Sequence, residues 1–99
     1  MIRHIVLWKL KDIPDRSKRE NALTIKEKLE ALDGIVPEIC EISVSLNVLN
    51  PEGNADVMLS ALFASPEDLE AYQKNPDHKE AGKFIKSVTE SRSAIDIEC

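Results

Sequence analysis

Three side chains in this 99-residue sequence carry groups suited to moving a proton or polarising a carbonyl, namely His4, Tyr72 and His78. Histidine titrates near neutral pH and is the usual general acid or base. Asn75 as a cap and Pro76 at the first helical position predict that His78 lies at a helix N-terminus, where the dipole disfavours imidazolium. We assign His78 as candidate general base and His4 and Tyr72 as acid or carbonyl-polarising groups.

Each of these side chains also has a structural interpretation, which the sequence leaves open. A lone histidine on an apolar strand face is often a satisfied core residue, and Tyr72 lies at helical spacing from Leu69 with its hydroxyl expected at the edge of a core. Two histidines without a carboxylate at ligand spacing make a weak metal site, and no glycine-rich phosphate loop is present. We therefore assign no metal and no cofactor.

The elements that must position these residues begin with a strand over residues 2–10, which is rich in β-branched and aromatic side chains. His4, Val6 and Trp8 share one face of this strand. The other face is also partly apolar, with Ile5 and Leu7, and this predicts a covering element or a second subunit.

An amphipathic helix follows, which begins with a capping box of Ser17 and Glu20 and ends at Gly34. Its apolar stripe comprises Ala22, Ile25, Leu29 and Leu32. Residues 40–49 alternate as a half-buried strand, and a turn with proline and glycine joins them to a second strand over residues 56–64. We expect Cys40, the first residue of this alternation, to be a buried small hydrophobe.

Two consecutive helices and a last strand complete the predicted order. Ser65 caps the helix that bears Leu69 and Tyr72, and Asn75 caps the helix that bears His78 and Ile85. The final strand covers residues 91–97.

The order strand, helix, strand, strand, split helix, strand predicts an α+β, ferredoxin-like βαββ(αα)β domain with one antiparallel sheet, spanning residues 1–99 as a single domain. Helices cover one sheet face, where we expect Val6, Trp8, Leu69 and Ile85 to line a ligand pocket beside the candidate catalytic groups. The uncovered face predicts a homodimer that places two sheets face to face, a dimeric α+β barrel.

Charge and cysteine content limit the kinds of partner and compartment that we expect for this protein. The net charge of −5 arises from scattered charges without a basic cluster, so nucleic acid is not an expected partner. The apolar N-terminal stretch is too short and too interrupted by charge for a membrane span, and it lacks the small-residue cleavage site of a signal peptide, so we expect a cytoplasmic protein. Only Cys40 and Cys99 are present, without the spacing of a zinc or redox motif, which predicts reduced thiols.

Three segments together resemble the stress-responsive dimeric A/B barrel family: residues 3–12 (RHIVLWKLKD), 63–72 (FASPEDLEAY) and 75–78 (NPDH). The resemblance covers nearly the whole chain. It implies a ferredoxin-like protomer, a dimer around a central barrel of two sheets, and a cavity between sheet and helices in each protomer.

The resemblance also bears on the site. A plant polyketide cyclase of this family works without a cofactor and uses a strand histidine, a helix tyrosine and a histidine after a proline, positions that His4, Tyr72 and His78 match. That enzyme has a further tyrosine on its first helix, where this sequence has Ile25 or Lys26. Some plant members are similar in carrying magnesium held by main-chain carbonyls after the first helix, which here implies the segment near Leu32, Ile35 and Glu38.

Three functions follow as alternatives. The first is a homodimer that binds a small apolar or aromatic ligand. The second is a cofactor-independent enzyme, of polyketide cyclase, isomerase or lyase type, with His78 as general base. The third is a structural or stress-tolerance dimer without a ligand, in which the histidines stabilise the core.

Overall fold

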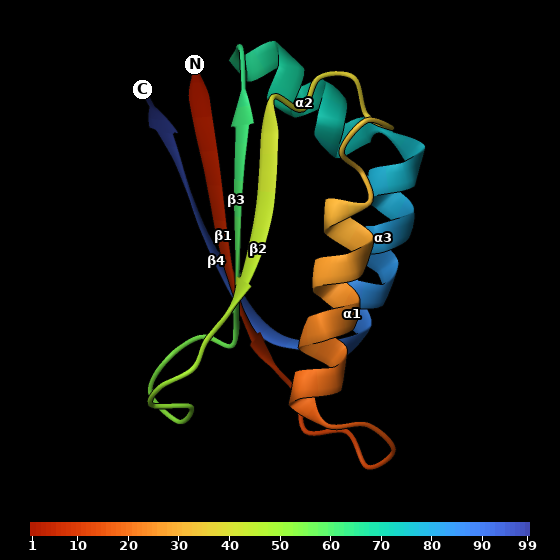
Figure 1. The fold of residues 1–99 in the computed structure, drawn as a ribbon, viewed down its shortest axis with the longest axis vertical. Coiled ribbons are helices and arrows are strands. Elements are labelled where there is room, and N and C mark those ends of the chain that lie inside the picture. Colours follow the sequence, from red (N-terminus) through yellow and green to blue (C-terminus); the bar gives the residue numbers. More distant parts are fainter.

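The computed structural model describes residues 1–99, and its helices and strands follow the predicted order (Figure 1). Four strands form one sheet, and three helices lie together on one side of it. The elements are β1 (Ile2–Leu10), α1 (Lys18–Glu30), β2 (Glu41–Leu46), β3 (Val57–Phe63), α2 (Pro66–Lys74), α3 (Pro76–Val88) and β4 (Thr89–Glu98). This is the ferredoxin-like α+β fold that the sequence predicts.

Each helix begins at a side chain that satisfies a free main-chain N–H group. The Ser17 hydroxyl accepts a hydrogen bond from the amide of Glu20 at 3.1 Å, and the Glu20 carboxylate accepts one from the amide of Ser17, which completes the predicted capping box. Ser65 caps α2 and Asn75 caps α3 in the same manner. Helix α3 begins right after the Asn75 cap, so His78 lies in its first turn, where its ring contacts the ring of Tyr72.

The sheet has the strand order β2-β3-β1-β4, and every neighbouring pair is antiparallel. Strand β1 is therefore central and carries His4 in the middle of the sheet. In the register of the strands, His4 lies opposite Ala61 on one side and opposite Asp96 on the other. Residues opposite each other project from the same face, so His4 and Asp96 both face the helices.

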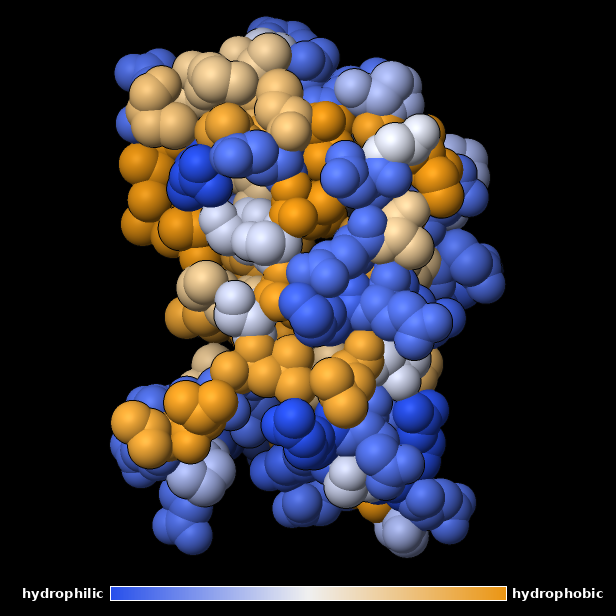
Figure 2. Space-filling view, viewed as in Figure 1, coloured by the Kyte–Doolittle hydropathy of each residue, from blue (hydrophilic) through white to orange (hydrophobic).

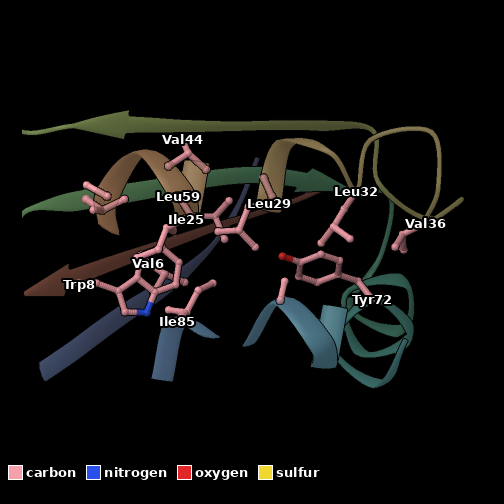
Figure 3. Close-up of a cluster of buried hydrophobic side chains, with 14 of the residues drawn as sticks. Val6, Trp8, Ile25, Leu29, Leu32, Val36, Val44, Leu59, Tyr72 and Ile85 are labelled. Carbon is pink, nitrogen blue, oxygen red and sulfur yellow. The ribbon is translucent and has the colours of Figure 1, made fainter. Parts of the chain in front are cut away.

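The core fills the layer between sheet and helices. Alternate residues of β1 and β3 point into it and meet the apolar stripe of α1, as Figure 3 shows for Val6, Leu59, Ile25 and Leu29. Each of these four side chains is at most 2% exposed. The predicted stripe of α1 is buried throughout, and so are Leu69, Tyr72 and Ile85 on the other two helices.

The opposite face of the sheet has no covering element in the protomer, and we call it the open sheet face. Its apolar side chains come from three strands and are Ile5, Leu7, Met58, Leu62, Ile95 and Ile97. Figure 2 shows apolar side chains gathered on the side of the molecule where the sheet lies, whereas much of the helical side is hydrophilic. Contiguous apolar surface of this kind marks an interaction site.

Two local predictions for the segment before and within β2 are wrong. Helix α1 ends at Glu30 rather than at Gly34, which lies in a later turn with φ of 83°. Cys40 is exposed, not buried, because β2 is an edge strand that begins at Glu41 and contacts α1 around Val44. Alternation in the sequence predicts which strand face carries Cys40, but it does not predict whether another element covers that side chain.

The two ends of the chain lie side by side at the same end of the sheet (Figure 1). The Met1 ammonium group donates to the Cys99 carbonyl at 3.1 Å, and the Cys99 amide donates to the Met1 carbonyl at 3.0 Å. These contacts extend the β1–β4 ladder to both termini. None of the three helices has the length and apolar character needed to cross a bilayer.

Candidate functional site

A cavity of about 410 Å³ lies between the sheet and α3. Its apolar wall comprises Val6, Trp8, Leu29, Leu59 and Ile85, and its polar lining includes His4, Tyr72 and His78. Further lining residues at the end of α3 and the start of β4 are exposed, among them Lys86, Glu90 and Arg92, so the cavity opens between these two elements. Its volume falls within the range typical of small-molecule sites, roughly 300–1,000 Å³.

His4 is held in one orientation by a carboxylate. Its Nδ1 lies 2.5 Å from Oδ1 of Asp96, and the imidazole is only 5% exposed. An ionised carboxylate only accepts hydrogen bonds, so Nδ1 carries the hydrogen of this contact. In a neutral ring Nε2 then holds a lone pair, and it is the ring nitrogen left for a molecule in the cavity.

Tyr72 is fully buried, yet its hydroxyl has no hydrogen-bond partner in the protein. The ring packs against Phe63 with centroids 4.9 Å apart, and Figure 3 shows the hydroxyl pointing towards the middle of the buried layer, where Leu29 lies. Burial raises the pKa of Tyr72 far above its usual value, so the phenol stays protonated and remains a donor. An unpaired buried hydroxyl costs about 1–3 kcal/mol.

His78 stacks at an angle on Tyr72, with ring centroids 4.2 Å apart, and its Nδ1 is also buried without a partner. Burial lowers the pKa of His78, a hydrogen bond with the main chain of Gln73 opposes that shift, and the electrostatic effects of His4 and Arg92 add to the lowering. The imidazole is therefore neutral at pH 7. The distance between the His4 and Tyr72 ring centroids is 6.5 Å, so both imidazoles lie near the Tyr72 ring.

The structure brings together most of the residues that the sequence singled out. His4, Tyr72, His78, Val6, Trp8 and Ile85 all line the cavity. Leu69 is buried in the core and is not among the lining residues.

Sequence reasoning missed Asp96, the partner of His4, and Arg92 at the mouth of the cavity. The alternation of residues 91–97 contained a signal for both, since two residues at even spacing share one face of a strand. What the sequence lacked was the register that places Asp96 opposite His4.

The segment after α1 does not match a cation site built from main-chain carbonyls. The Leu32 carbonyl accepts hydrogen bonds from the amides of both Ile35 and Val36, each at 3.0 Å, which uses its two lone pairs. A magnesium ion coordinated by Leu32 would require this turn to unwind. We derive no chemistry from a metal at this position.

The fold and the cavity define a class: ferredoxin-like α+β proteins with a small-molecule-sized cavity between the sheet and the helices. Within that class, the family model of the stress responsive A/B barrel domain matches residues 2–99. The chain belongs to this family.

Three known proteins illustrate the relationship. The Arabidopsis thaliana stress-response A/B barrel domain-containing protein DABB1 is 29% identical over 97% of this chain, which spans only 46% of that protein. A dimeric protein of unknown function from Bacteroides fragilis, with a ferredoxin-like fold, is 35% identical, with a TM-score of 0.89 and coverage of 99% and 95% of the two chains. A hydroxynitrile lyase from Passiflora edulis is 21% identical, with a TM-score of 0.79 and coverage of 97% and 90%, and so shares the fold.

Proposed function

We propose that this chain forms a homodimer in which each protomer binds a small apolar or aromatic molecule in the cavity. The observation that carries the proposal is the pairing of an apolar wall with two buried polar atoms that lack partners, the Tyr72 hydroxyl and Nδ1 of His78. Natural proteins rarely leave such atoms unpaired. A ligand with a hydroxyl or carbonyl group satisfies both while its apolar body contacts Trp8 and Ile85.

The homodimer is supported by the open sheet face and by the dimeric state of the similar Bacteroides fragilis protein. Leu7 and Ile95 lie on this face, 39% and 57% exposed in the protomer. A two-fold axis brings the same apolar patch of a second copy onto this one and removes both from water. We place the dimer in the cytoplasm, because both cysteines are exposed and free, as a reducing compartment keeps them.

Ligand binding is tested through Trp8, the only tryptophan, which lines the cavity. Fluorescence quenching by a panel of small aromatic and β-polyketone compounds should saturate for the wild type and weaken strongly for His78→Ala. Circular dichroism monitors folding of the variant. Lys79→Ala, an exposed neighbour on the same helix outside the cavity, serves as the matched control.

Two results together contradict the proposal. If no compound saturates and His78→Ala melts at a lower temperature than wild type, the histidines serve the core. The protein is then a structural dimer without a ligand, the third function that the sequence allows.

A second candidate function is catalysis on a carbonyl compound without a cofactor. The neutral imidazole of His78 supports a role as general base, the protonated phenol of Tyr72 supports a role as hydrogen-bond donor that polarises the carbonyl, and Asp96 fixes the orientation of His4. Such groups act on an enolisable carbonyl, and each proton transfer contributes roughly 10²- to 10⁴-fold in rate. The fold shared with a hydroxynitrile lyase favours lyase or isomerase chemistry as the reaction to assay.

Catalysis is distinguished from binding by turnover. Compounds that saturate the quenching are incubated with the protein and analysed for conversion. We expect a pH-dependent rate of conversion that is lost in His78→Ala although the variant still folds. Saturable binding without conversion would support ligand binding and contradict catalysis.

A further inference from the structure

The mouth of the cavity carries charge that the proposed binding of an apolar body does not use. Arg92 lies opposite Trp8 in the β1–β4 register, and both side chains line the cavity. The Arg92 guanidinium forms no hydrogen bond or ion pair in the protein, and neither does the ammonium group of Lys86 nearby. Glu90 also lines the cavity but does not pair with Arg92.

The two ends of the cavity therefore differ in character. The inner end offers the neutral Tyr72 hydroxyl and His78 Nδ1, which suit a hydroxyl or carbonyl group. The mouth offers two unpaired cations against one carboxylate. Between them lies the apolar wall, so a ligand that uses the whole cavity has a polar neutral group, an apolar body and an anionic group.

We infer that Arg92 makes the cavity selective for small apolar or aromatic acids, whose carboxylate pairs with its guanidinium at the mouth. This inference rests on the ligand-binding function proposed above and names its ligand class. Arginine is suited to the role because its planar fork donates two parallel hydrogen bonds to a carboxylate, whereas Lys86 offers a point charge. The net charge of −5 disfavours anions elsewhere on the protein, so the attraction is local.

The expected selectivity is modest, because Arg92 is exposed and water screens its charge. A bidentate pair beside an apolar wall corresponds to about a 5- to 10-fold preference for an acid over its neutral analogue. Added salt should reduce this preference, since the pair lies at the rim.

The test uses two probes of nearly equal shape, 4-phenylbutyrate and 4-phenylbutyramide, titrated against Trp8 fluorescence. Wild type should bind the acid more tightly, Arg92→Gln should bind both equally, and Arg92→Lys should retain part of the preference. Arg19→Gln, an exposed arginine on α1 outside the cavity, is the matched control and should behave as wild type. The solution mass of each variant confirms that dimerisation is unchanged.

Three results overturn the inference and separate it from the proposed function. Equal binding of acid and amide by wild type removes anion selectivity while the cavity remains a binding site. A preference that persists in Arg92→Gln but disappears in Lys86→Gln assigns the anion contact to Lys86. Absence of saturation by these probes and by the aromatic panel refutes the binding function together with the inference.

Discussion

Replacing Tyr72 with phenylalanine tests whether the cavity is organised for a ligand at the expense of stability. The hydroxyl is fully buried and unpartnered, while the ring packs on Phe63 and His78. Tyr72→Phe keeps the ring and removes the unpaired group, which should raise the free energy of unfolding by about 1 kcal/mol. For a domain of this size, that corresponds to an increase in Tm of about 4–8 °C.

The assay combines thermal unfolding, followed by circular dichroism, with quenching titrations on the same samples. Wild type and variant are compared at one protomer concentration without ligand, because the Tm of a dimer depends on concentration. We expect the variant to be more stable and yet to bind its ligand about 2- to 10-fold more weakly, because a single hydrogen bond contributes roughly 0.5–1.5 kcal/mol. A gain in stability with a loss in affinity distinguishes a binding group from a core residue.

A decrease in Tm of several degrees would refute this reasoning, since it would mean that the hydroxyl is hydrogen-bonded in the free protein. Phe63→Leu is the control for packing in the same cluster, because Phe63 touches the Tyr72 ring but carries no polar atom. This substitution should lower Tm, because a flat ring is replaced by a smaller, differently shaped side chain.

Three further predictions concern protonation and assembly. Burial holds the pKa of His78 below 6.5, so below about pH 6.5 the unfolded chain binds more protons than the folded one and acidification lowers the free energy of unfolding. In urea unfolding, His78→Gln should lose less of this free energy than wild type between about pH 7.5 and 5, and an equal loss contradicts the prediction. In Asp96→Asn, the new side-chain amide should donate to Nδ1 of His4, which moves the ring hydrogen to Nε2. ¹⁵N NMR of the imidazole detects this change of tautomer, and unchanged ¹⁵N shifts would contradict the prediction. Leu7→Glu on the open sheet face should yield a monomer by sedimentation, whereas Leu23→Glu on the outer face of α1 should not, and a dimer in both would exclude the sheet face.

The parts of the fold that depend on neighbouring residues were predictable from the sequence. Ser17, Ser65 and Asn75 each accept from an amide two or three residues further on, so the information for a helix start is contained in a few positions. The central strand was equally clear, because residues 2–10 are rich in β-branched and aromatic side chains. The sequence also placed His78 correctly in a first helical turn.

Apart from the end of α1, the errors and omissions arose where distant segments meet. The exposure of Cys40 depends on how far α1 extends over an edge strand, and alternation within residues 40–49 does not contain that information. Asp96 is separated from His4 by 92 positions, and only the register of β1 with β4 unites them. Arg92 enters the site through the same register, opposite Trp8.

The hydrogen-bonded ends of the chain have a practical consequence for protein engineering. Because Met1 and Cys99 are adjacent, a short glycine and serine linker can join them without distorting β1 or β4. New termini can then be opened in an exposed connection, giving a circular permutant with the same sheet. The same adjacency allows the domain to be inserted into a surface loop of a host protein, where Trp8 fluorescence would report occupancy of the cavity from within the fusion.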